Sequence, residues 1–99
     1  SGKSLSLPQG QILELQLRSN PGTGYSWQLA GTGEVLRQQG PMVFMPDPHE
    51  AMVVGSGGTE VWRFSAVKPG RQTLRLEYRR PWEKDAPAAE TFTCDINVP

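Results

Sequence analysis

Cysteine and histidine are the scarcest reactive residues of this chain. Among 99 residues there is one cysteine, Cys94, and one histidine, His49. A lone cysteine excludes an internal disulfide, and it excludes the zinc sites that need paired cysteines. A thiol protease needs a cysteine and a histidine within hydrogen-bonding reach, so catalysis of that kind would depend on this one pair. The fold is therefore expected to be held by packing alone.

Excess charge and long apolar runs are missing as well. Ten basic and ten acidic residues give a formal net charge of zero, so no long-range field attracts the chain to nucleic acid or to an anionic membrane. No apolar run approaches the roughly 20 residues that a membrane-spanning helix needs. Residues 1–4 do not resemble a targeting signal. The sequence thus predicts neither a nucleic-acid partner nor a membrane partner.

Apolar residues are instead spread evenly over a chain of the size of one domain. A chain of 99 residues buries roughly two thirds of its unfolded surface when it folds. No internal repeat, low-complexity tract or dividing linker interrupts it. Residues 1–99 are therefore predicted to form a single domain, with a monomer as the simplest assembly and with no cofactor implied by any motif.

The dominant periodic signal is alternation of apolar and polar residues. Leu13, Leu15 and Leu17 alternate with polar residues, and the same period of two returns in four later segments. This period is that of a β-strand with one buried face. The expected strands are 4–7, 13–18, 25–30, 42–46, 59–67, 71–79 and 92–98.

About seven short strands, separated by turns rich in Gly, Pro, Asn and Asp, predict an all-β fold. In about 100 residues this pattern is typical of an immunoglobulin-like sandwich of two antiparallel sheets. The Cys-Trp-Cys signature of antibody domains is absent. The fold class predicted is thus an immunoglobulin-like two-sheet sandwich without that signature.

The order of the strands also predicts where the loops lie. If successive strands run antiparallel, loops that are separated by two strands leave the sandwich at the same end. Two strands separate the loop around 20–24 from the loop around 46–58, and two more separate that loop from 80–90. We therefore expect the three loops side by side at one end. A full extra strand at Val35 and Leu36 would break this parity for the first loop.

Three short motifs fall in these loops. They are NPGTGYSW at 20–27, GSGG at 55–58 and RPW at 80–82. In order and spacing they resemble the three signature loops of chagasin-like inhibitors of papain-type cysteine proteases, and the resemblance covers the whole chain. Each motif alone is weak, whereas the three in this order are specific. The family's first loop usually has two threonines; here Gly22 stands in place of the first, and Thr23 keeps the second.

The resemblance implies an immunoglobulin-like fold whose three loops plug the active-site cleft of a papain-like, cathepsin-type cysteine protease. It implies a reversible, tight-binding, competitive and non-catalytic inhibitor, and export to the periplasm or the medium for a bacterial member. The residues that it assigns to protease binding are Asn20, Pro21, Gly22, Thr23, Gly24, Tyr25, Gly55, Ser56, Gly57, Gly58, Arg80, Pro81 and Trp82.

The loop residues themselves suit a blocker of a narrow cleft. Glycines let the backbone approach closely, and Pro21 restricts Asn20, which lowers the ordering cost of docking. The Asn20 side chain is expected to fold onto the following backbone as an Asx turn. Residues 55–58 offer mainly main-chain contact along the cleft wall. Trp82 is the expected anchor and Arg80 its partner, because Trp and Arg are enriched among interface hot spots.

Simpler interpretations exist for each motif. NPGTG alone is typical of a tight turn, and GSGG alone is typical of a flexible loop. Tyr25 and Trp27 lie in phase with Leu29, so Trp27 is expected in the core. Trp62 alternates with Phe64 and is expected to be buried. An adhesion or carbohydrate-binding module is the alternative function, with Trp82 and Tyr25 as a sugar-stacking platform. Such platforms need several coplanar aromatics, whereas this surface offers one exposed Trp.

Catalysis and metal binding find little support in the sequence. Cys94 lies in phase with Phe92 and Ile96, on the buried face, where cysteine is an inert small hydrophobe. Asp47, His49 and Glu50 cluster in one loop, but a lone surface histidine is far more often solvated than ligating. A carboxylate pair for glycoside hydrolysis is not apparent, since we expect solvent-facing positions for the glutamates, namely Glu14, Glu34, Glu60, Glu77, Glu83 and Glu90. The protein is predicted not to be an enzyme.

Overall fold

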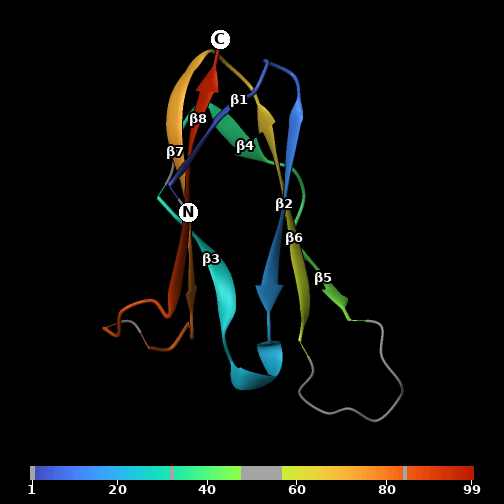
Figure 1. The fold of residues 1–99 in the computed structure, drawn as a ribbon, viewed down its shortest axis with the longest axis vertical. Coiled ribbons are helices and arrows are strands. Elements are labelled where there is room, and N and C mark those ends of the chain that lie inside the picture. Colours follow the sequence, from blue (N-terminus) through green and yellow to red (C-terminus); the bar gives the residue numbers. More distant parts are fainter. Residues whose placement is uncertain (1, 32, 48–56, 84) are drawn as a thin grey trace.

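The computed structural model describes residues 2–31, 33–47, 57–83 and 85–99 (Figure 1). A 3₁₀ turn, η1 (Pro21–Thr23), is the one helical element of these residues, and none of them forms a helix that could cross a membrane. The strands are β1 (Lys3–Ser6), β2 (Ile12–Ser19), β3 (Ser26–Ala30), β4 (Leu36–Gln38), β5 (Val43–Pro46), β6 (Gly58–Ala66), β7 (Gly70–Arg79) and β8 (Glu90–Val98).

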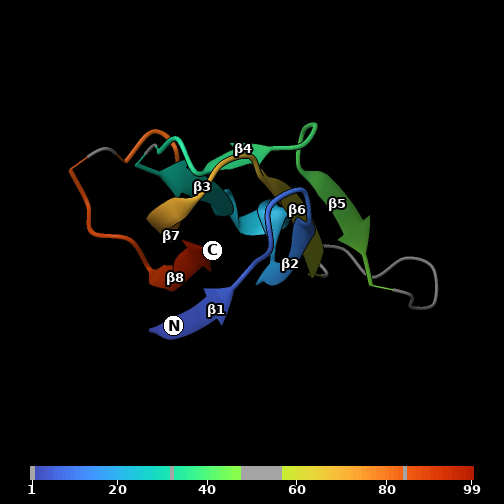
Figure 2. The same cartoon turned by 90° about the horizontal axis from the view of Figure 1, so that it is seen from above.

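The strands form two sheets that face each other (Figure 2). One sheet has the order β1-β8-β7-β3, and the other has β2-β6-β4, with β5 also paired to β6. The predicted all-β sandwich is therefore confirmed. The described residues form eight strands rather than about seven, and β1 pairs with β8 in parallel. The parallel pair arises because the chain crosses from β1 to β2 in the opposite sheet, so no hairpin forces β1 to run antiparallel to its neighbour.

The extra strand is β4, and it does not break the parity argument. Both β4 and β5 pair antiparallel with β6, so they run in the same direction along one edge of the sheet. Between Gln38 and Val43 the chain advances by two more residues than its partner does between Phe64 and Val61. This excess is a bulge that interrupts one edge strand. The direction of the chain is kept, because the bulge adds no reversal.

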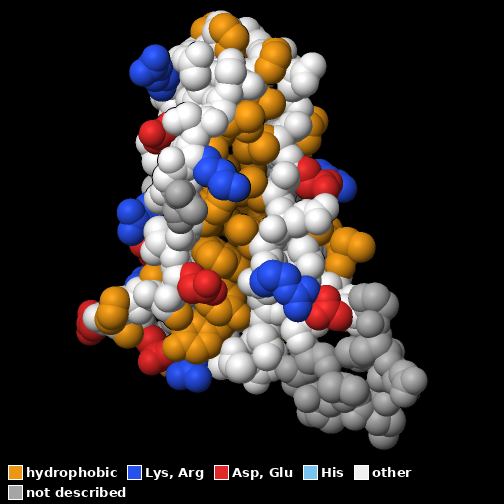
Figure 3. All heavy atoms as spheres, viewed as in Figure 1, with side chains coloured by type: hydrophobic (Ala, Val, Ile, Leu, Met, Phe, Trp, Pro, Cys, Tyr) orange, Lys and Arg blue, Asp and Glu red, His pale blue; other side chains and the backbone are white. Residues whose placement is uncertain are grey.

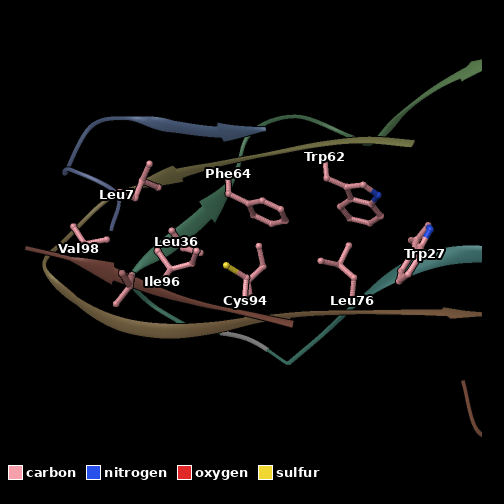
Figure 4. Close-up of a cluster of buried hydrophobic side chains, with 12 residues drawn as sticks. Leu7, Trp27, Leu36, Trp62, Phe64, Leu76, Cys94, Ile96 and Val98 are labelled. Atoms are coloured by element: carbon pink, nitrogen blue, oxygen red, sulfur yellow. The ribbon is translucent and has the colours of Figure 1, made fainter. Parts of the chain in front are cut away.

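The core lies between the sheets, where the inward residues of each alternating strand meet (Figure 4). Phe64 from one sheet and Leu76 and Ile96 from the other are no more than 2% exposed. Trp27 and Trp62 are also buried, as the phase of their strands predicted. Each fully buried side chain of this size contributes about 1.5–3 kcal/mol by leaving water. Packing of alternating apolar residues thus accounts for the cohesion of a fold without a disulfide.

The edges of the sandwich are less well covered. Leu13, Leu15 and Leu17 of β2 are only half-buried, because β2 has a neighbour on one side alone. Leu29, in phase with Trp27, is 40% exposed near the end of the edge strand β3. Figure 3 shows the result as a band of hydrophobic side chains down the middle of one face, between the two sheets. Charges of both signs lie along the sides of this band.

Glu60 contradicts the expectation that the glutamates face solvent. Its side chain is 1% exposed and points into the interior from β6. The alternation of β6 indicates this burial, because Glu60 is in phase with the buried Trp62 and Phe64. The prediction was wrong because it weighed residue type above phase.

Candidate functional site

The first and third motif segments and the start of β6 at Gly58 lie at one end of the sandwich (Figure 1). In one sheet, Ser19 at the end of β2 and Pro46 at the end of β5 both pair with Gly58, the first residue of β6. In the other sheet, β3 begins where β7 ends, since Ser26 pairs with Arg79. The same end of the sandwich is therefore the starting point of three segments: residues 20–25, the connection from β5 to Gly57, and residues 80–89.

The first segment is a rigid turn rather than an open loop. The amide of Thr23 donates to the carbonyl of Asn20 over 3.0 Å, and the amide of Gly24 donates to that of Pro21 over 2.9 Å. The Thr23 hydroxyl adds a third bond, of 2.7 Å, to the Asn20 carbonyl. Gly24 ends the turn with a φ of +85°, in the left-handed region where glycine carries no Cβ penalty.

The Asn20 side chain does not behave as expected. It makes no capping hydrogen bond, and its Oδ1 is buried without a partner. The predicted Asx turn is therefore wrong. The Asn20 carbonyl takes its place, because it accepts both the amide and the hydroxyl of Thr23.

A cluster of aromatic rings lies next to the turn. Tyr25 stacks on Tyr78 of β7 with 5.3 Å between the ring centroids, and the centroids of the Trp27 and Tyr78 rings are 5.1 Å apart. The Tyr78 hydroxyl accepts a hydrogen bond of 2.8 Å from the amide of Asn20. Tyr78 lies in the predicted strand 71–79, and its hydroxyl joins the turn to the end of β7. Such aromatic pairs add about 0.5–1.5 kcal/mol beyond the area they bury.

The third segment packs directly on the first. Arg80 donates from Nε to the Thr23 carbonyl over 3.1 Å, and its guanidinium lies 4.6 Å above the Tyr25 ring. Trp82 is 67% exposed, yet its ring covers Gly24. A Cβ added at Gly24 would lie 2.5 Å from Cη2 of Trp82. Glycine is thus required at this position both for its backbone angle and for the close approach of the indole.

A tight turn holds the third motif itself. The amide of Glu83 donates to the Arg80 carbonyl over 3.1 Å, and the Glu83 carboxylate lies 3.4 Å from the Arg80 guanidinium. The turn spans Pro81 and projects Trp82 outward. Arg79 faces the other way, where it donates to the Ala86 carbonyl over 2.7 Å and holds the base of the segment.

The second motif is only partly visible, since Gly55 and Ser56 lie outside the described residues. Gly58 is the buried first residue of β6, where a Cβ would lie 2.5 Å from the Met45 carbonyl oxygen. The amide of Asp47 donates to the Gly57 carbonyl over 3.2 Å, which closes the base of the connection.

An ion pair ties this base to β2. Arg18 donates to both carboxylate oxygens of Asp47, each over 2.7 Å. These hydrogen bonds, together with the charge of Asp47, raise the pKa of the Arg18 guanidinium. Because the pair is bidentate, it holds Asp47, the residue after β5, against the end of β2.

The described residues at this end do not form a catalytic or metal-binding group. Cys94 is buried in the core, and burial raises the pKa of its thiol, which keeps it protonated and unreactive. Asp47 is engaged by Arg18, while His49 and Glu50 of the same cluster lie outside the described residues. In the described part of the chain, no three His, Cys, Asp or Glu side chains form a metal site.

One surface hollow of the described residues lies away from the motif segments. A hollow of about 560 Å³ is lined by β1, β7 and β8 near Leu5, Gln72 and Ile96, toward the end opposite the motif segments. The motif end projects instead, with an exposed indole and a rigid turn side by side. Of the described residues at this end, Trp82 is exposed and residues 20–24 form a turn held by backbone hydrogen bonds.

Comparison with known proteins places this chain in a family. The model of the chagasin family peptidase inhibitors, I42, matches residues 6–96. The chain therefore belongs to the chagasin family of peptidase inhibitors, and the predicted family is confirmed.

Two relatives illustrate the likeness. Chagasin of Trypanosoma cruzi is 32% identical over 98 residues, which span 94% of this chain and 86% of the relative. Amoebiasin-1 of Entamoeba histolytica is 32% identical over 95 residues, which span 96% of this chain and 89% of the relative.

A solved structure matches the fold. The cysteine protease inhibitor EhICP2 from Entamoeba histolytica superposes with a TM-score of 0.86 and 26% identity, over 98% of this chain and 86% of that chain. The sandwich architecture is thus shared with this cysteine protease inhibitor over nearly the whole length of the present chain.

Proposed function

We propose that this chain is a reversible, tight-binding, competitive inhibitor of papain-like cysteine proteases of the cathepsin type. Membership of the chagasin family of peptidase inhibitors supports an inhibitory rather than an enzymatic role. The description of EhICP2 as a cysteine protease inhibitor supports the class of protease. We further propose that residues 1–99 act as one inhibitor domain and as a monomer.

One observation carries the proposed mode of binding: the first and third segments form a single preorganised unit. Trp82 covers Gly24, and Arg80 binds the Thr23 carbonyl. Contacts that exist before docking need not be ordered during docking, and this saving appears directly in affinity. A papain-type site is a narrow cleft around a reactive thiolate and its histidine. A rigid turn beside an exposed indole fits such a cleft as a wedge.

Each segment has its own part in this proposal. The turn at 20–25 occupies the centre of the cleft with its backbone, and Gly22 allows close approach. Residues 55–58 run along one wall through main-chain contacts, because glycine and serine offer few side-chain atoms. Arg80, Pro81 and Trp82 bind the other wall, with Trp82 as the anchor. An interface of about 1,600 Å² with a preorganised centre reaches nanomolar affinity, about −12 kcal/mol.

A carbohydrate-binding module is a weaker explanation of the same surface. A sugar platform needs several exposed, coplanar aromatic rings. Trp82 is the one large aromatic side chain among the exposed hydrophobic residues of the described chain. Tyr25 and Tyr78 stack on each other and are half-buried. The surface therefore lacks the second open ring that stacking on a sugar chain needs.

The direct test is inhibition of papain with a fluorogenic peptide substrate. We expect the apparent Michaelis constant to rise with inhibitor concentration at constant maximal rate, and activity to return on dilution. Trypsin, assayed with its own fluorogenic peptide, is the control and should be unaffected, since its active site has no thiolate. Full papain activity at micromolar inhibitor would overturn the proposal.

Two adjacent arginines allow a matched test of the third segment. Arg80→Ala removes the contacts with Thr23 and Tyr25, and we expect it to weaken inhibition about fivefold, or roughly 1 kcal/mol. Arg79→Ala should weaken inhibition less and lower the melting temperature more, because Arg79 holds the Ala86 carbonyl instead. The inhibition constants and the melting curves of both variants show which of the two arginines acts in inhibition and which in stability. The opposite order of inhibition constants would mean that Arg79, not Arg80, meets the protease.

A further inference from the structure

Glu60 is a buried acidic residue beneath the motif end, and every polar contact that it makes is with a donor. Its Oε2 accepts the Ser19 hydroxyl over 2.6 Å and the amide of Trp27 over 3.2 Å. Its Oε1 accepts the indole N–H of Trp62 over 3.2 Å. With 1% exposure, the side chain has little access to solvent, so these three donors replace its hydration.

Two of the three donors lie on either side of the first motif segment. Ser19 is the last residue of β2, directly before the turn, and Trp27 lies in β3, directly after it. These two strands belong to different sheets. Glu60 itself lies near the start of β6, two residues after Gly58, where the second connection enters the sheet. One side chain thus joins both ends of the first segment to the strand that follows the second.

We infer that Glu60 is a positioning residue of the inhibitory surface, an inference that rests on the proposed function for its role in inhibition. It sets the distance between the two ends of the first segment across the gap between the sheets. A second bond acts in parallel, from the Trp27 indole N–H to the Arg18 carbonyl over 2.8 Å. A buried acidic side chain adds little stability over an apolar one of equal volume, so its contribution here is geometry.

Glutamine is the informative replacement because it keeps the shape but not the acceptors. An amide has one oxygen and one NH₂ group, whereas three donors face Glu60. If the amide oxygen takes Ser19 and Trp27, the NH₂ group meets the Trp62 N–H. If it is turned round, the NH₂ group faces both the Ser19 hydroxyl, which can rotate to accept from it, and the Trp27 amide, which cannot. In either orientation one donor loses its partner, and the spacing of the two sheets at this end is no longer held.

The experiment compares Glu60→Gln with Val98→Ala, which removes part of a side chain that is 2% exposed, at the end of β8. Val98 pairs with Gly70 at the opposite end of the sandwich, so this variant controls for a general loss of core stability. Papain inhibition, melting temperature and amide hydrogen exchange of residues 19–27 are measured for both. We expect Glu60→Gln to weaken inhibition about fivefold and to speed exchange in residues 19–27. Val98→Ala should lower the melting temperature without either effect.

The outcomes separate this inference from the proposed function. If the unmodified protein does not inhibit papain, the proposed function fails, and hydrogen exchange still decides whether Glu60 holds the turn. Exchange and inhibition in Glu60→Gln equal to those of Val98→Ala would overturn the inference. Should Glu60→Gln fail to fold, Ser19→Ala removes one of the three bonds and should produce a smaller change of the same kind. Unchanged amide hydrogen exchange of residues 19–27 in a folded Ser19→Ala variant would then overturn the inference about Glu60.

Discussion

Replacing Trp82 with alanine is expected to raise the inhibition constant against papain about 30-fold, or at least roughly 2 kcal/mol, as truncation of a hot-spot residue does. The indole is 67% exposed in the free protein, so most of its surface is available to be buried by a partner. Its loss also uncovers Gly24, which frees the backbone of the first segment. The melting temperature should change little, since Trp82 lies outside the core.

Ile12→Ala is the matched control for Trp82→Ala. Ile12 is 53% exposed at the start of β2, at the end of the sandwich away from the motif segments. The Ile12→Ala substitution removes an exposed apolar side chain outside the proposed interface, so we expect an unchanged inhibition constant. If Trp82→Ala inhibits as well as Ile12→Ala, the third segment is not an anchor.

Two glycines inserted between Gly22 and Thr23 are expected to weaken inhibition at least tenfold while the melting temperature hardly moves. The insertion separates the partners of the turn, whose bonds join Thr23 to Asn20 and Gly24 to Pro21. Lengthening an exposed loop costs folding under about 1 kcal/mol. The lost order must then be restored on docking, and roughly 1.4 kcal/mol of such cost corresponds to a tenfold change in affinity.

The control for this insertion is the same pair of glycines placed in the turn at 68–70, at the opposite end of the sandwich. That variant should show a similar small change in melting temperature and normal inhibition. The paired measurement of melting temperature and inhibition constant gives the answer. If both quantities stay unchanged for the insertion after Gly22, the segment only turns the chain, and the central claim about its role fails.

Much of the sandwich followed from alternation alone. The expected strands 59–67, 71–79 and 92–98 correspond to Gly58–Ala66, Gly70–Arg79 and Glu90–Val98. Long strands with one buried face repeat the period of two often enough to be recognised. The short strand Leu36–Gln38 escaped this pattern because three residues carry too little periodicity. It is also separated from Val43–Pro46 by a bulge of two extra residues, which breaks the edge strand into two short pieces although the phase is kept.

Some features of the candidate site could be predicted from the sequence, and others could not. The motifs and their residue types were legible in the sequence, including an exposed Trp82 and a buried Trp27. The Asn20 cap was predicted wrongly, because a local propensity cannot tell that the Thr23 hydroxyl and amide already meet the Asn20 carbonyl. Local rules describe which bonds a residue can make, and neighbours decide which of them it does make.

The sequence by itself determined the two-sheet sandwich, the family and the positions of three glycine- and proline-bearing segments, because each depends on periodicity or on order along the chain. Only the tertiary structure decided how these segments support one another. Trp82 covers Gly24, and Arg80 binds the Thr23 carbonyl. Glu60 joins the strands on either side of the first segment. These contacts join residues far apart in the chain, and alternation specifies only the face on which a side chain lies, never the partner that it meets there.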